Sequence, residues 1–388
     1  MDHQHRLNVS EELRPTPKPV LRIKGTAISA LVLTAALSMT ACSSGNDSSS
    51  GNDSGSAMST DSASSVEQQP TESTAQEEAA DETAMEQNRS DSNEQTDDTE
   101  MLPPEQIPTA LLQGKESAVY KQLTPAFQQV LTQQQLVDTV QSSLQNVASF
   151  EQLGKVVTLN HHTQYNWLDN NGKLGLTAIV DEQGKIAGLQ LQPIQSFPAT
   201  DQKLTTATYR LPLQGDWFVF WGGSNVLQNY HYAVESQRYA YDFIQVKDGM
   251  SYSGNATRNE SYYAFGQPAL APADGTVVAV VNNIADNEPV GNMNPQQPAG
   301  NSVVIRHGNE YSLLGHLQKG SVTVNKGDTV QAGQIIGKIG NSGNSSEAHL
   351  HFQVADRPDL ATGTSIPIRW QGEIEPVKGD MVSGKVNY

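Results

Sequence analysis

His349 and His351 stand one residue apart in the stretch SSEAHLHFQVAD (345–356), which has the alternating pattern of a β-strand. Successive side chains of a strand point to opposite faces, so the two histidines share one face while Leu350 and Phe352 share the other. The apolar side should face the core, which leaves both imidazoles on one open surface. Two neutral imidazoles side by side suit a metal ion, or a metal ion plus a general base. The alternative is a polar strand face on which histidine happens to occur twice.

The elements that would hold this pair are strands. Between residues 204 and 388, short apolar runs such as ADGTVVAVV, GNSVVIRHG and YSLLGHL are separated by glycine-containing turns. Closely spaced strands without intervening helices are typical of an all-β sandwich or barrel. We therefore expect residues 204–388 to form an all-β, antiparallel domain.

A different pattern precedes it, from residue 104 to about 200. The run TQQQLVDTVQSSLQNV predicts a helix with Thr132 as its N-cap and an apolar stripe made of Leu136, Val137, Val140, Leu144 and Val147. Strand-like runs then follow, separated by the turn signals DNNGK and DEQGK. This order predicts a small α+β domain, cystatin-like or similar, and His161 and His162 should be polar surface residues in it.

The N-terminus has the features of an export signal. A basic stretch that contains Arg14, Lys18, Arg22 and Lys24 precedes the apolar run TAISALVLTAALSMTA (26–41), which is too short for a comfortable membrane span. The run ends at Cys42, which is the only cysteine of the chain, so no intrachain disulfide can form. The stretch MTAC resembles the lipobox of bacterial lipoproteins, which implies cleavage after residue 41 and lipid attached to Cys42. A plain secretory signal with a chance cysteine is the alternative.

Most of the negative charge lies in a single segment. The formal net charge is −18, and residues 43–100 contain 15 acidic side chains but one basic side chain, Arg89. With few aromatic or branched apolar residues, residues 42–103 should be a disordered linker between the lipid anchor and the folded domains. No basic patch large enough for nucleic acid is present.

The C-terminal segments resemble a known family. PADGTVVAV, and the run from GNSVVIRHG through GKIGNSGNSSEAHLHFQV, are similar to the lysostaphin/LytM-type zinc metallopeptidases, over residues 268–356 and more loosely back to RYAYDF. The resemblance implies a compact antiparallel β fold (a duplicated hybrid motif) and hydrolysis of peptide bonds in peptidoglycan.

The resemblance also assigns roles to single residues. His351 matches the second histidine of the H-x-H motif and Asp242 matches the carboxylate, so both should bind Zn²⁺. His349 and His316 match the two histidines that act on the reacting water and the oxyanion. Two histidines and one carboxylate form a common catalytic zinc site with an open position, and zinc lowers the pKa of a bound water toward about 7.

One zinc ligand departs from the family pattern. In the family, the first two zinc ligands form the motif H-x-x-x-D. In this chain the residue four positions before Asp242 is Arg238, whose guanidinium offers no lone pair to a metal ion. We expect His231, eleven residues before Asp242, to supply the third ligand, with Asn229 and Glu235 as weaker alternatives. Arg238 could pair with a substrate carboxylate or with Glu235. A loop-like insert at 282–301 should border the substrate groove.

These observations predict a lipid-anchored zinc endopeptidase that hydrolyses peptidoglycan. Because Ser43 follows the lipidated cysteine, we expect it on the periplasmic face of the outer membrane. The main alternative is a degenerate member of the same family that has lost zinc and activates a partner cell-wall amidase. A lipoyl-like carrier, suggested by KGDTVQAGQIIGKIG, lacks a suitably placed lysine.

Overall fold

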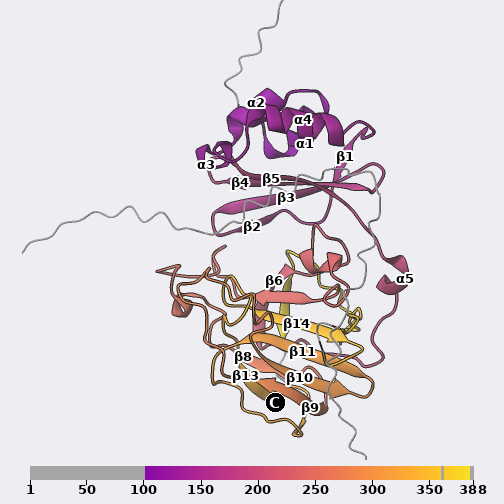
Figure 1. The fold of residues 1–388 in the computed structure, drawn as a ribbon, viewed down its shortest axis with the longest axis vertical. Helices are drawn as coiled ribbons and strands as arrows, with labels where there is room; N and C mark the ends of the chain where they lie inside the picture. Colours follow the sequence, from indigo (N-terminus) through magenta and orange to yellow (C-terminus); the bar gives the residue numbers. More distant parts are fainter. Residues whose placement is uncertain (1–100, 360–361, 385–388) are drawn as a thin grey trace, which may run out of the picture.

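The computed structural model describes residues 101–359 and 362–384. The predicted signal peptide, Cys42 and most of the predicted linker lie outside these residues. Within the described ranges, no helix is both long enough and apolar enough to cross a membrane. The fold consists mainly of antiparallel β-sheet with few helices (Figure 1).

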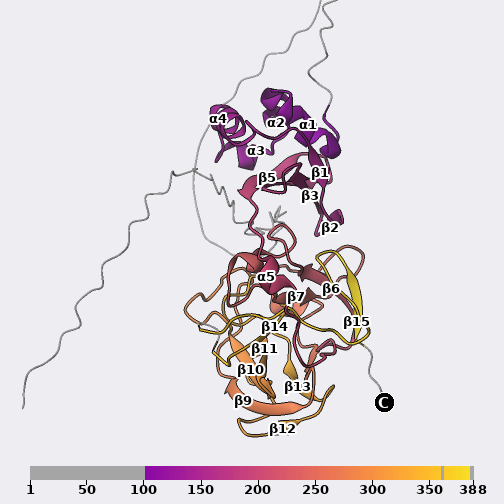
Figure 2. The same ribbon diagram turned by 90° about the vertical axis from the view of Figure 1, so that its right-hand side faces the viewer.

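The N-terminal part, residues 101–201, packs short helices against a five-stranded sheet. Its elements are η1 (Pro104–Gln106), α1 (Ile107–Leu112), α2 (Glu116–Gln122), α3 (Pro125–Gln128), α4 (Gln133–Ser143), β1 (Phe150–Gln152), β2 (Val157–Leu159), β3 (His162–Asp169), β4 (Leu174–Asp181), β5 (Ile186–Pro193) and α5 (Pro198–Asp201). The sheet order is β1-β3-β4-β5, and β2 pairs with the first residues of β3. Helices α1–α4 cover one face, and β2 lies on the side toward the rest of the chain (Figures 1 and 2).

Helix α4 begins as its sequence predicts. The Thr132 side chain accepts a hydrogen bond from the Gln135 backbone while the Gln135 side chain accepts one from the Thr132 backbone, a complete capping box. Leu136 and Val140 are buried in the core between helices and sheet. The helix ends at Ser143, so Leu144 is its C-cap and Val147 lies beyond it; the predicted stripe was too long. The cystatin-like description and the domain boundaries stay predictions.

The C-terminal part, residues 204–384, is built on an eight-stranded antiparallel sheet of order β12-β9-β10-β11-β14-β7-β6-β15. Its strands are β6 (Gly215–Trp221), β7 (Tyr241–Ile244), β9 (Gly275–Val281), β10 (Asn301–His307), β11 (Glu310–Leu317), β12 (Thr329–Val330), β14 (Leu350–Ala355) and β15 (Met381–Gly384). Strands β8 (Pro268–Leu270) and β13 (Ile335–Lys338) form a second, two-stranded sheet. Two 3₁₀ turns, η2 (Tyr230–Ala233) and η3 (Asn259–Ser261), interrupt the loops.

The core of the C-terminal part lies against one face of this sheet. Leu350, Phe352 and Val354 of β14 are fully buried there, and Phe352 packs against Trp370. The predicted alternation of β14 is therefore correct, and it directs the intervening side chains, His351 and Gln353, to the opposite face.

Candidate active site

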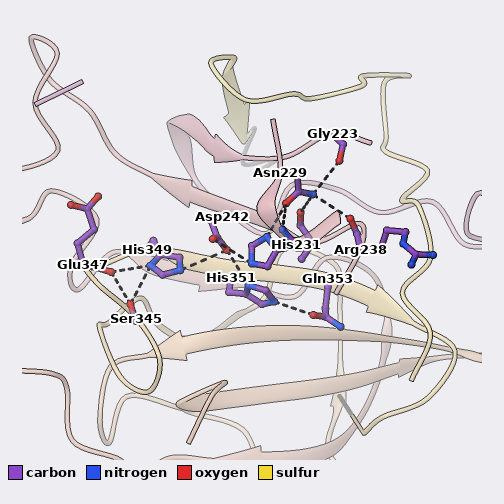
Figure 3. A network of polar contacts seen from close by, with 11 residues as sticks. Gly223, Asn229, His231, Arg238, Asp242, Ser345, Glu347, His349, His351 and Gln353 are labelled. Atoms are coloured by element: carbon purple, nitrogen blue, oxygen red, sulfur yellow. Dashed lines mark hydrogen bonds and ion pairs between the residues drawn. The ribbon is translucent and has the colours of Figure 1, made fainter. Parts of the chain in front are cut away.

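The register of three central strands brings the predicted residues together. Strand β14 pairs with β7 so that His351 lies directly opposite Asp242, and β14 pairs with β11 so that His351 lies opposite Gly315. His316 follows at the end of β11, and His349 immediately precedes β14. The His351 Nδ1 atom is 2.9 Å from Asp242 Oδ1, and His349 Nε2 is 3.6 Å from the same oxygen. Residues separated by more than a hundred positions thus meet on one face of the sheet (Figure 3).

His231 reaches this face from outside the sheet, on η2. Asn229 caps η2: its Oδ1 accepts hydrogen bonds from the His231 backbone and lies 2.9 Å from His231 Nδ1. The Asn229 amide nitrogen donates to the backbone carbonyls of Gly223, Arg238 and Ala240, which fixes the orientation of the amide. His231 Nε2 is consequently directed at Asp242, 3.6 Å from Oδ2.

His231, Asp242 and His351 form a group with metal-binding geometry. One ligand atom from each lies within 4.8 Å of the others, and all three residues are buried. Two ligand atoms on one tetrahedral zinc ion are about 3.3 Å apart, given zinc–nitrogen bonds of about 2.0–2.1 Å. The 3.6 Å between His231 and Asp242 is close to that separation.

The hydrogen bonds around His231 and His351 indicate which ring nitrogen has a lone pair available for a metal ion. Because the amide oxygen of Asn229 faces His231 Nδ1, that nitrogen carries the proton and Nε2 presents a lone pair. Gln353 orients His351 in the same way. The Gln353 amide nitrogen donates to the Ser236 carbonyl, so the Gln353 amide oxygen faces His351 Nε2 and accepts a hydrogen bond from it. In the neutral His351 ring the lone pair is then on Nδ1, which points at Asp242. Two lone pairs and a carboxylate that converge in a buried space fit a cation, and partners of this kind orient metal-binding histidines.

His349 and His316 are oriented by backbone carbonyls. His349 Nδ1 lies 2.8 Å from the Glu347 carbonyl oxygen, and His316 Nδ1 lies 2.8 Å from that of Ser342. A carbonyl can only accept, so in each neutral ring Nδ1 carries the proton and Nε2 is the basic atom. The two rings are neighbours, with centroids 4.7 Å apart. His316 has a φ of +59°, a left-handed conformation that is uncommon outside glycine and occurs at functional sites.

The electrostatics favour a carboxylate among neutral imidazoles. Burial lowers the pKa of His231 to about 3 and lowers that of His316 well below its ordinary value. Burial alone would raise the pKa of Asp242, but the three neighbouring imidazoles outweigh it and lower that pKa. His351 differs from the other two rings, because burial lowers its pKa but the neighbouring Asp242 raises it overall.

The histidine face is more enclosed than the sequence suggested. His349 and His351 are only 8% and 6% exposed, so the prediction of an open surface is wrong. The loop around η2 and the end of the insert cover this face, leaving a cavity of about 50 Å³ lined partly by Gln237, Pro298 and Ala299. The end of the 282–301 insert does border the site, as predicted. At the cavity, the half-exposed ring of Tyr230 packs on His231 with 3.9 Å between ring centroids.

Arg238, which the sequence singles out, and a further histidine, His307, lie away from the cluster. The Arg238 side chain points away from the histidines (Figure 3). Its guanidinium stacks 3.5 Å from the Phe197 ring centroid and donates to the Tyr232 carbonyl, so it joins two loops. His307 bridges the Asp274 carbonyl and the Ser312 hydroxyl, in keeping with a structural role.

Sequence reasoning missed the residues that orient the histidines. The sequence predicts Asn229 only as a weaker alternative ligand and assigns no role to Gln353. Their positions offered a signal, because each lies two residues from a predicted ligand and carries an amide.

Comparison with known proteins identifies the family of the C-terminal part. Residues 261–361 match Peptidase family M23, a range that contains His316, His349 and His351 but begins after Asp242. Over 105 residues the chain is 37% identical to the peptidoglycan DD-endopeptidase ShyA of Vibrio cholerae, covering 26% of this chain and 21% of that one. Over 89 residues it is 38% identical to an uncharacterized metalloprotease of Haemophilus influenzae, covering 23% and 16%.

The chain thus spans about a fifth or less of these two relatives. Its match to lipoprotein NlpD of Yersinia enterocolitica, 32% identical over 89 residues, covers 23% of this chain and 77% of that one. Among solved structures, the catalytic domain of lysostaphin from Staphylococcus simulans is 23% identical, with 32% of this chain and 73% of that chain covered and a TM-score of 0.21. A zinc-containing peptidase from Vibrio cholerae is 20% identical, with 56% and 57% covered and a TM-score of 0.22. On the sequence matches, the chain belongs to peptidase family M23.

Proposed function

We propose that the protein is a zinc-dependent endopeptidase that hydrolyses peptide bonds of peptidoglycan. The observation that carries this proposal is the convergence of His231, Asp242 and His351, with lone pairs directed inward, beside His316 and His349. The ShyA relative is a peptidoglycan endopeptidase by name, which supports the choice of substrate. Nitrogen and carboxylate donors in this number suit zinc.

The chain's own groups would do the following. His231, Asp242 and His351 hold the ion, which when bound polarises the scissile carbonyl and lowers the pKa of a water. His349 Nε2 is the basic atom of a neutral ring that lies beside Asp242, so it accepts the proton of the attacking water and returns it to the leaving amine. His316, whose ring lies next to His349 and whose Nδ1 proton is held by the Ser342 carbonyl, would accept a hydrogen bond at Nε2 and so help to hold the attacking water.

The test is to express residues 103–388 and to measure both metal content and release of peptides from purified peptidoglycan. We expect about one zinc ion per chain and cleavage that a chelator abolishes. A preparation that contains no metal and cleaves nothing would contradict the proposal.

The sequence also leaves a second candidate function. In it, the protein has no peptidase activity and instead binds and activates a cell-wall amidase. The missing histidine at position 238 and the enclosed cavity favour it. The same preparation separates the two, because an activator raises amidase activity in a reconstituted mixture without cleaving peptidoglycan alone.

We further propose that lipid on Cys42 anchors the protein to the cell envelope, at the periplasmic face of the outer membrane. The stretch MTAC and the lipoprotein name of the NlpD relative support this. Labelling with a radioactive fatty acid should mark the wild-type chain and not the Cys42→Ala variant.

A further inference from the structure

The turn between β2 and β3 joins the N-terminal part to the active-site side of the C-terminal part. Asn160 in this turn has a φ of +50° and is only 5% exposed. Its backbone nitrogen donates to the Gly249 carbonyl over 2.8 Å. Beside it, Val157 and Leu159 of β2 pack against Ile244, which lies two residues after Asp242 on β7. The N-terminal part is therefore packed on the strand that supplies the candidate carboxylate ligand.

A buried chain of hydrogen bonds leads from this turn to the loop before His349. The Asn160 amide nitrogen donates to the Ser251 hydroxyl over 3.0 Å, and the Ser251 backbone nitrogen donates to the Asn160 amide oxygen over 2.9 Å. The Ser251 hydroxyl lies 3.3 Å from that amide oxygen and 3.2 Å from Glu347 Oε2. The hydroxyl accepts from the Asn160 amide nitrogen and can donate its own hydrogen to Glu347 Oε2.

Glu347 transmits the contact to the catalytic histidine. Its carboxyl group is buried, and burial raises its pKa to about 7 even though the Ser251 hydrogen bond lowers it. Among the described residues the second carboxyl oxygen, Oε1, finds no hydrogen-bond partner, so the side chain depends on Ser251. The backbone carbonyl of Glu347 accepts the hydrogen bond from His349 Nδ1 (Figure 3). A shift of residue 347 would therefore move the group that sets the orientation and tautomer of His349.

We propose that the N-terminal part positions His349, through the buried contacts that run from Asn160 by way of Ser251 to Glu347. Asn160, Ser251 and Glu347 are positioning residues, and their contribution to turnover rests on the proposed peptidase function. The N-terminal part then serves catalysis as well as linking the folded chain to its N-terminal segment.

The test uses full-length protein and the variant Asn160→Gly, because glycine adopts the left-handed conformation freely and keeps the backbone bond to Gly249. The matched control is His161→Asn, in the same turn, since His161 is exposed and contacts Glu182 instead. Hydrogen–deuterium exchange of residues 345–350 is measured on metal-free and zinc-loaded protein, together with kcat, KM and zinc content.

We expect faster exchange at 345–350 in Asn160→Gly and a kcat about 3- to 10-fold lower, the effect of a lost buried hydrogen bond, with KM and zinc content unchanged. His161→Asn should match the wild type. Glu347→Gln, which keeps an oxygen for Ser251, should also match it, whereas Glu347→Ala should behave as Asn160→Gly does.

Wild-type exchange at 345–350 in Asn160→Gly would overturn the inference, as would wild-type turnover in Glu347→Ala. Loss of zinc from Asn160→Gly would also count against it, because the effect would then act through the ligands. If the wild type neither binds zinc nor cleaves peptidoglycan, the proposed function fails, while the exchange experiment still decides whether the coupling exists.

Discussion

The replacement of His231 by alanine tests the least expected ligand. Its Nε2 lies 3.6 Å from Asp242 Oδ2, near the spacing of two ligands on one zinc ion, and Asn229 holds the ring in that orientation. Removal of a residue that only orients a ligand weakens metal binding by about 10- to 100-fold. Loss of the ligand itself should weaken zinc binding more than loss of an orienting residue does. We therefore expect the zinc affinity of His231→Ala to fall more than about 100-fold, which is a loss of at least about 2.8 kcal/mol of binding free energy.

The assay is competition for zinc with a chromophoric chelator of known affinity, measured on purified His231→Ala and on the wild type. The control is His316→Asn, because asparagine tolerates the left-handed backbone at position 316 and His316 is not an expected ligand. That control should bind zinc as tightly as the wild type while losing cleavage. Wild-type zinc affinity in His231→Ala, or an equal loss in both variants, would refute the assignment of the third ligand.

Three further predictions concern single side chains. His349→Ala should lower kcat by about 10²- to 10⁴-fold at unchanged zinc content, measured by peptide release, because a positioned base is lost. The raised pKa of Glu347, about 7 against 4.5, means that its stabilising contribution is complete below about pH 4.5 and is lost as the pH rises through 7. Between pH 4.5 and pH values above 7, the unfolding free energy of the wild type, measured with denaturant, should fall by about 3 kcal/mol more than that of Glu347→Gln. An equal pH dependence of the unfolding free energy in the two proteins would contradict this. Thr132→Ala should cost about 1 kcal/mol of unfolding free energy by removing the α4 cap, whereas the exposed Thr158→Ala should cost less.

Strand β14, which carries His351, was predictable because the alternation of its side chains is a local property of the sequence. Alternation along β14 follows from backbone geometry alone, so the core side and the histidine side were assigned correctly. The degree of burial was not predictable, because the covering residues come from distant loops such as those that contain Gln237 and Pro298. Exposure depends on tertiary contacts that no local pattern records.

The position of His231 was predicted only through the family resemblance, which demanded a third ligand near Asp242. The segment between His231 and Asp242 can adopt many conformations. The sequence does not show which of them brings the His231 ring close to the sheet. The structure supplies the reason in Asn229, whose amide is tied to three carbonyls and so places η2. The end of α4 was misjudged for a related reason: apolar residues continue past Ser143, and their pattern does not mark where a helix stops.

The candidate ligands lie on two kinds of backbone, strand and loop, with a consequence for how such sites evolve. Asp242 and His351 are neighbours across paired strands, so a one-residue insertion in either strand would turn a ligand to the other face. His231 arrives on a loop turn, where residues can be gained or lost without disturbing that pairing. The spacing between the first two ligands is therefore free to drift during divergence, and a search for relatives that demands H-x-x-x-D would pass over chains that retain the same three-dimensional centre.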